Sequence, residues 1–237
     1  KNVNLVPVIK KLGEPLAPNE VNLQVMPPPD MPPALAAKKI DAFIVAEPFN
    51  AAGELLAGGK MLRFTGDIWR NHPCCVVCMN EDKVKKNPEW TQKVMNAIVK
   101  AQIYSQNNKE EVAHMLSKDG KKYLPMKAPV VKRAMTLYDT TSYEKPKAIV
   151  NSDWGSGRID FQPWPFPSAT KLIVNELQNT LVGGDSTFLA DLDPDFVTKD
   201  LVDYEFVKNA MDLHTGWKDA PGFNADSPFD REEIISL

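Results

Sequence analysis

The sequence predicts an α/β fold, and three patterns along the chain carry this prediction. Residues 40–46 form a short, nearly unbroken apolar run, which is typical of a strand buried on both faces of a parallel sheet. Residues 21–26 alternate apolar and polar side chains, which indicates a strand with one buried face. Residues 87–117 place apolar side chains three and four positions apart, which predicts a long amphipathic helix.

The long helix is expected to begin at Asn87-Pro88, because proline suits the first turn of a helix. Asn107 and Asn108 are expected to break it, so that a second helix covers 109–117. The side chains expected on its buried face are Trp90, Val94, Ala97, Ile98, Ala101 and Tyr104.

The remaining elements follow from periodicity and from turn and cap residues, with Asp30 and Ser168 as expected N-caps. Further helices are expected at 4–13, 31–39, 50–57, 128–139, 167–182 and 198–213. Further short strands are expected at 61–65 and 74–80, and a loop at 150–163. In the last helix the side chains expected to face inward are Leu201, Tyr204, Val207, Ala210 and Met211.

Composition limits the classes of function. The 237-residue chain is long enough for one large domain or two small ones, and its 43% hydrophobic and 25% charged residues are ordinary for a globular protein. A net charge of −3 gives no basic excess that could neutralise phosphates, so nucleic acid is excluded as a partner. No apolar run approaches the roughly 18 residues that a membrane-spanning helix needs.

The apolar run at 40–46 ends abruptly at Glu47-Pro48, because proline has no N–H to continue a ladder. A carboxylate therefore stands at the carboxyl end of a predicted strand, where open α/β sheets bind their ligands. Glu47 is either a ligand-binding residue or a solvated strand terminus, and both interpretations stay open at this point.

Two segments resemble the substrate-binding proteins of nitrate, sulfonate, taurine and bicarbonate ABC transporters. The first is residues 40–50, in which Ile-Asp-Ala and four apolar residues lead to Glu-Pro-Phe-Asn. The second is residues 66–73, Gly-Asp-Ile-Trp-Arg-Asn-His-Pro, which is similar to the nitrate and bicarbonate branch. The resemblance is clear over residues 5–115 and looser beyond them.

This resemblance implies a two-lobed, type II periplasmic-binding-protein fold. Residues 1–73 would form most of lobe 2, a return crossover would lie at about 74–80, and residues 81–237 would form the C-terminal part of lobe 1. The N-terminal part of lobe 1 would precede Lys1, and no signal sequence is present in the chain. The implied protein is a monomer in the periplasm, or anchored outside the membrane.

The implied function is the capture of a small organic or oxyanionic solute between the lobes by hinge closure, for delivery to an ABC permease. No cofactor or metal is implied. The ligand-binding candidates are Glu47, Asn50, Trp69, His72, Gln162 and Trp164. Trp69 and His72 come from the second segment, where an imidazole is a suitable partner for an oxyanion, although His72 could equally be a plain loop residue and Trp69 a packing residue.

Gln162 and Trp164 come from residues 161–170, which are similar to a third family segment. Where the nitrate-type proteins carry a basic residue, a histidine and an acid, this chain has Pro167, Ala169 and Thr170. The aromatic residues of this segment suggest a larger, partly apolar pocket, although aromatic side chains more often belong to the core.

Three cysteines, Cys74, Cys75 and Cys78, lie on one predicted strand, where they cannot easily bridge one another. We expect them to be free, buried and structural. The alternative is an enzyme similar to the fungal synthase of the thiamine pyrimidine precursor, which shares the fold and uses iron and a histidine. A sensor domain on the same scaffold is a third possibility.

Overall fold

The structure is a computed structural model, and it describes residues 24–155, 157–178, 185, 187–219 and 228–236. Helices dominate these residues, and an isolated antiparallel bridge pairs Trp69 with Ile235. The elements are η2 Pro28–Asp30, α2 Met31–Ala36, α3 Phe49–Ala57, α4 Thr65–Ile68, α5 Glu81–Lys86, α6 Pro88–Asn107, α7 Lys109–Leu116, α8 Ala128–Thr136, α9 Thr140–Glu144, η3 Ser152–Trp154, α10 Pro167–Leu177, α11 Thr187–Ala190, α12 Pro194–Leu201, α13 Glu205–Leu213 and η4 Thr215–Asp219.

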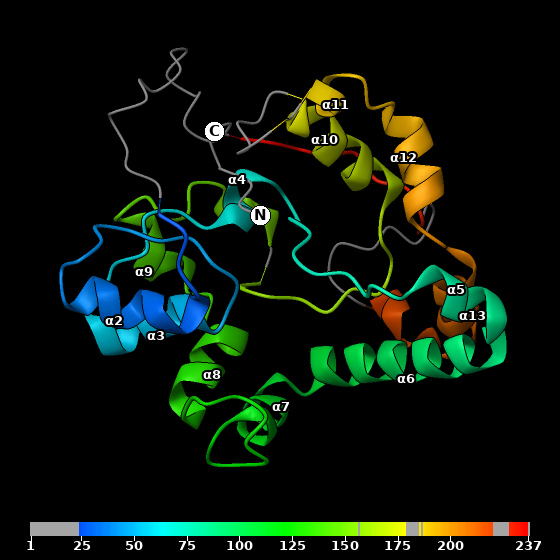
Figure 1. The fold of residues 1–237 in the computed structure, drawn as a ribbon. Coiled ribbons are helices and arrows are strands. Elements are labelled where there is room, and N and C mark those ends of the chain that lie inside the picture. The colour runs from blue at the N-terminus through cyan, green and yellow to red at the C-terminus, as the bar shows by residue number, and fades with distance from the viewer. Residues whose placement is uncertain (1–23, 156, 179–184, 186, 220–227, 237) are drawn as a thin grey trace.

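The helices gather in two groups (Figure 1). In the first group α2 packs on α3, α3 packs on α8, and α8 packs on α7. In the second group α6 packs on α13, and α10 packs on α12. Long irregular segments run between the groups, and one of them, residues 157–166, carries two of the residues that the sequence analysis selected.

The strands expected at 40–46, 61–65 and 74–80 do not form in the described chain. Residues 40–46 are irregular, and Ile44 is 52% exposed rather than buried on both faces. An apolar run favours an extended backbone, but a strand also needs a neighbour that pairs with its N–H and C=O groups. The predicted strand at 21–26 lies partly outside the described residues, and 24–26 are irregular.

The helix predictions are mostly confirmed. α2 and α8 begin where expected, at residues 31 and 128, and each ends three residues before the predicted end. α3 begins one residue before the expected range 50–57 and ends where expected. α3 ends at Gly58, which has the left-handed φ of 66° that glycine adopts without strain. The long helix breaks at Asn108, which separates α6 from α7 as predicted. The expected helix at 4–13 lies outside the described residues.

The buried face of α6 differs from the predicted one. Trp90 is 55% exposed and Tyr104 44% exposed, whereas Val99 is fully buried. α6 carries two apolar stripes, and α13 packs against the stripe that contains Met95 and Val99. Periodicity detects both stripes but does not show which one another helix will cover.

The helix caps and the last helix are also corrected. Asp30 does stand at the N-cap of α2, as expected, but its side chain makes no capping bond. Ser168 lies within the first turn of α10, whose N-cap is Phe166. The helix expected at 198–213 is two helices, α12 and α13, and Leu201 is 73% exposed at the end of the first. The three inward residues expected in α13 are buried, namely Val207, Ala210 and Met211.

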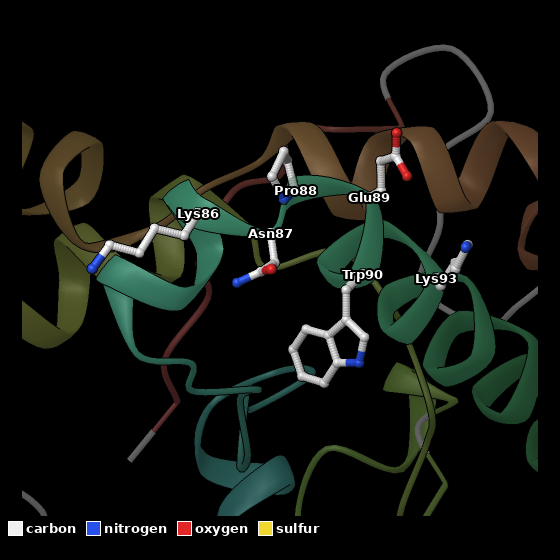
Figure 2. Close-up of a pocket in the computed structure, with 6 residues that line it drawn as sticks. All are labelled: Lys86, Asn87, Pro88, Glu89, Trp90 and Lys93. Atoms are coloured by element: carbon white, nitrogen blue, oxygen red, sulfur yellow. The ribbon is translucent and has the colours of Figure 1, made fainter.

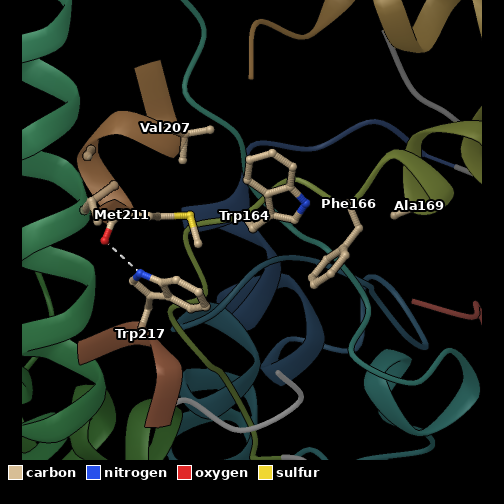
Figure 3. Packing of buried hydrophobic residues seen from close by; sticks show 8 residues of the cluster. Trp164, Phe166, Ala169, Val207, Met211 and Trp217 are labelled. Carbon is tan, nitrogen blue, oxygen red and sulfur yellow. Dashed lines mark hydrogen bonds between the residues drawn. The ribbon is translucent and has the colours of Figure 1, made fainter. Parts of the chain in front are cut away.

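A cluster of buried side chains, centred on Trp164, Met211 and Trp217, forms the core of the second helix group (Figure 3). The indole N–H of Trp217 donates to the carbonyl of Met211 over 2.8 Å, and that of Trp164 donates to the carbonyl of Phe229 over 3.0 Å. Buried indoles need such acceptors, so these bonds fix the orientation of both rings. This core positions the segment around residues 164–169.

The part of the chain that the structure describes has no helix long and apolar enough to cross a membrane.

Candidate functional site

Glu47 lies in a buried network of charges beside the N-terminus of α3. Its carboxylate accepts a hydrogen bond from Arg158 Nε at 2.7 Å and one from the backbone N–H of Ala51 at 3.0 Å. The Arg158 side chain is 1% exposed and forms a second ion pair, with Glu54, at 2.7 Å. Burial raises the pKa of Glu47, and the Arg158 charge opposes that rise only in part.

The network continues through Glu54 to α8 and α9. Arg133 of α8 pairs with Glu54 at 3.2 Å, and the Tyr143 hydroxyl donates to Glu54 at 2.6 Å. Burial favours the neutral form of Glu54, but the hydrogen bonds from these two residues and Arg158 prevail and lower its pKa. Two guanidinium groups and two carboxylates thus balance in charge. Together with Tyr143 of α9 they tie α3, α8 and α9 to the segment that begins near residue 157.

Asn50 also lies at the start of α3, where its amide nitrogen donates to the carbonyl of Val45. Asn50 and Glu47 therefore both hold the turn that joins residues 40–46 to the helix. The structure brings these two predicted residues together at one helix end.

Trp69 and His72 lie after α4, against the C-terminal segment 228–236. The Trp69 indole N–H donates to Glu233 over 2.6 Å, and the edges of the Trp69 and His72 rings meet with centroids 5.2 Å apart. Desolvation, together with the charge of Arg231, lowers the pKa of His72, so its neutral imidazole form is favoured.

Glu233 is the centre of a second cluster of polar contacts. Arg231 donates to both of its carboxylate oxygens, over 2.7 Å from Nε and 3.0 Å from Nη2, and the Ser168 hydroxyl donates over 2.7 Å. The Glu233 side chain is 9% exposed and that of Arg231 15% exposed. The Arg231 guanidinium also lies 4.4 Å from the centroid of the Phe166 ring.

Gln162 and Trp164 lie on the segment between these two clusters. The backbone carbonyl of Gln162 accepts a hydrogen bond from Gln102 of α6 over 3.4 Å. The Trp164 ring is 9% exposed and belongs to the core of the second helix group. Trp69 packs against the same core, so the structure brings Trp69 and Trp164 into one cluster.

Sequence reasoning missed the partners of the predicted residues. Arg158, Arg231, Glu233 and Ser168 make the strongest polar contacts of the two clusters, but no local motif marks them. Apart from the Arg231–Glu233 pair, their partners lie far away in the sequence, as 111 positions separate Glu47 from Arg158 and 164 separate Trp69 from Glu233. The only local hint was that Arg158 and Arg231 are isolated cations within segments rich in aromatic or acidic residues.

The cysteines are free, as expected, but exposed rather than buried. Their segment does not form the predicted strand, and the Cys74 and Cys75 sulfurs lie 3.5 Å apart. Desolvation of the Cys74 sulfur by its neighbours, together with the adjacent Cys75 thiol, raises the pKa of Cys74 to about 11. Within the described ranges, no three histidine, cysteine or acidic side chains gather as metal ligands would.

Two shallow hollows lie elsewhere on the described surface. The larger, of about 420 Å³, opens where α5 meets α6, and Lys86, Trp90 and Lys93 are among the residues that line it (Figure 2). The smaller, of about 330 Å³, lies between α7 and α8 beside His114. Neither is lined by a ligand-binding candidate of the sequence analysis, so the candidate site rests on the two polar clusters.

Comparison with known proteins matches residues 10–117 of this chain to the NMT1-like family. The chain is 30% identical over 141 residues to the nitrate/nitrite binding protein NrtA of Nostoc sp. strain PCC 7120, and 29% identical over 144 residues to that of Synechococcus elongatus. Each alignment covers 59% of this chain and 29% of the relative, so the chain spans less than a third of these relatives.

The predicted resemblance is confirmed. The NMT1-like family implies a periplasmic-binding-protein fold. A segment of the chain is also 32% identical over 100 residues to the nitrate import ATP-binding protein NrtC of Synechocystis, which covers 41% of this chain and 15% of that protein. No solved structure matches the chain.

Proposed function

We propose that this chain is the solute-binding part of an ABC importer. It captures a small organic or oxyanionic solute of the sulfonate, nitrate or bicarbonate class in a cleft between two lobes that close about a hinge. The single observation that carries this proposal is the similarity to nitrate/nitrite binding proteins over 141 residues. In this proposal residues 1–73 belong to lobe 2, 74–80 to the crossover and 81–237 to lobe 1.

The proposed partner is an ABC permease in the membrane, and the proposed location is the periplasm or the outer face of the membrane. Similarity to ATP-binding proteins of nitrate import and of bicarbonate transport supports a partner of the ABC class. The relatives carry names of binding and ATP-binding proteins, which favours binding over the alternative of a pyrimidine-precursor synthase. A monomer remains our expectation.

The proposed ligand-binding residues are Glu47, Asn50, Trp69, His72, Gln162 and Trp164. Trp69 and His72 support this proposal most directly, because they lie beside Arg231, a half-buried cation that suits an anionic solute. Glu47 would hold the site together through its ion pair with Arg158. It would contact a solute only through the carboxylate lone pairs that its present partners leave free.

Isothermal titration calorimetry at low ionic strength tests the proposal, with nitrate, nitrite, bicarbonate, taurine and an alkylsulfonate as ligands. One class should bind, and Trp69→Phe should weaken it about fivefold or more by removing one indole donor. The matched control is Trp90→Phe, which changes an exposed indole elsewhere and should leave the affinity within about twofold. Equal affinity in both variants, or no heat from any ligand, would overturn the proposal.

A second candidate is a solute sensor attached to an ATPase, and the match inside ATP-binding proteins favours it. A sensor predicts that the chain and its solute change the rate of an isolated cognate ATP-binding protein. An import role predicts stimulation only when the permease is present in the membrane, so ATPase assays with and without the permease separate the two.

A further inference from the structure

The carboxylate of Glu233 is held by donors from three separate parts of the chain. They are the Trp69 indole after α4, the Ser168 hydroxyl in the first turn of α10, and the Arg231 guanidinium. All four hydrogen bonds measure between 2.6 and 3.0 Å. Three sources that converge on the two oxygens of a single carboxylate define an anion-binding geometry rather than a simple ion pair between neighbours.

Each donor is positioned by contacts that do not involve Glu233. The Trp69 ring packs against the core cluster around Trp164, and Ser168 is held in α10. Arg231 is stacked 4.4 Å from the Phe166 ring. Donors that are fixed before an anion arrives bind it without a large cost of reordering.

The backbone that follows Glu233 is also fixed without its side chain. Arg70 N–H donates to the Ile234 carbonyl over 3.0 Å, and Ser236 N–H donates to the Ile68 carbonyl over 2.8 Å. These bonds flank the isolated bridge between Trp69 and Ile235. Removal of the Glu233 carboxylate therefore leaves the backbone of this segment pinned and the three donors in place.

We propose that Trp69, Ser168 and Arg231 form a seat for a planar oxyanion, and that Glu233 occupies this seat as a ligand supplied by the chain itself. Carboxylate, nitrate and bicarbonate are all planar groups that offer two oxygens to a guanidinium fork. Ser168 lies in the first turn of an 11-residue helix, whose positive end adds to the attraction for an anion. A solute anion reaches the seat by displacing the Glu233 side chain.

This inference deepens the proposed function, and only its last step, displacement by a solute, depends on that function. The seat itself is tested by replacing the internal ligand. Glu233→Ala should lower the melting temperature, and formate, nitrate or acetate should then raise it by about 3–6 °C at ten times their dissociation constant. Potassium chloride at equal ionic strength should not raise the melting temperature, and tetrahedral sulfate should raise it less than the planar anions do.

The matched control is Glu232→Ala, which removes the neighbouring acidic side chain from the same pinned segment. Wild type and this control should show a smaller anion-specific rise than Glu233→Ala, because an anion must first displace the Glu233 carboxylate from the seat. Failure of formate, nitrate and acetate to stabilise a folded Glu233→Ala protein, or equal stabilisation of the control, would overturn the seat whatever the transported solute is.

A measurement on the wild-type chain covers the case in which Glu233→Ala does not fold. The ¹⁵N–¹H signal of the Trp69 indole, assigned with Trp69→Phe, reports the bond to Glu233 directly. Saturation with the solute found by calorimetry should shift this signal, whereas potassium chloride should not. An unchanged indole signal with a bound solute would overturn displacement while leaving the proposed import function intact.

Discussion

Replacement of Arg158 should test how strongly the charge network around Glu47 holds the first helix group. Arg158→Met keeps an unbranched side chain of similar reach but removes the guanidinium that is paired with Glu47 and Glu54 at 2.7 Å each. Because the Arg158 side chain is 1% exposed and these carboxylates 12% and 9%, the loss leaves a buried excess of negative charge. Breaking a buried pair in this way costs about 3–5 kcal/mol of unfolding free energy.

The assay is urea unfolding followed by far-UV circular dichroism, which gives the midpoint and the slope for each variant. The control is Lys85→Met, which breaks the exposed pair with Glu81 and should leave the unfolding free energy unchanged within error. Adding Glu47→Gln to Arg158→Met should recover part of the loss, because it removes the uncompensated charge.

The pH dependence of this loss follows from the raised pKa of Glu47, which burial causes and which Arg158 only partly opposes. A carboxyl group whose pKa is raised in the folded protein lowers the free energy of unfolding as the pH rises through that raised pKa. Arg158→Met should therefore be more destabilised at pH 8 than at pH 5. If it is as stable as Lys85→Met at both values, the network does not hold the group together.

Three further outcomes can be measured. The pKa of the His72 imidazole, followed by NMR, should lie below its ordinary value, and Arg231→Gln should raise it again. The stability that depends on neutral His72 is lost as the pH falls below that ordinary value. An unshifted pKa would contradict the contact with Arg231. Cys74, whose pKa is raised to about 11, should react slowly with iodoacetamide at pH 8, and labelling at the rate of an ordinary thiol would contradict the raised pKa. Gly120→Ala should destabilise the chain by about 2 kcal/mol or more in urea unfolding, because a Cβ there would lie 2.2 Å from a backbone oxygen. The control is Gly66→Ala, whose Cβ would meet nothing within 4 Å. Equal stability of the two variants would contradict the packing around Gly120.

The helices could be predicted from the sequence because their signals are local. Apolar spacing, Asn108 as a break and Gly58 as a stop placed α3, α6 and α7 correctly. The strands could not, because a ladder depends on a partner whose position no local pattern records. For the same reason the predicted buried face of α6 was wrong, since α13 and the core around Trp164 and Trp217 cover the other face.

Only about half of the candidate site could be predicted from the sequence. The Glu-Pro and Trp-Arg-Asn-His-Pro motifs drew attention to Glu47, Trp69 and His72, and the structure places each of them in or beside a polar cluster. Arg158 and Glu233, which complete the clusters, come from more than 100 positions away. Such pairs are fixed by tertiary folding, and a single sequence does not show them.

The segment that starts at Arg158 and ends at Phe166 is fastened at both ends, to Glu47 and Glu54 in one helix group and to Arg231 in the other. Fully stretched, these nine residues reach about 30 Å. Moving the two ends of this segment further apart than this reach would first break a buried ion pair of Arg158 or the contact between Phe166 and Arg231.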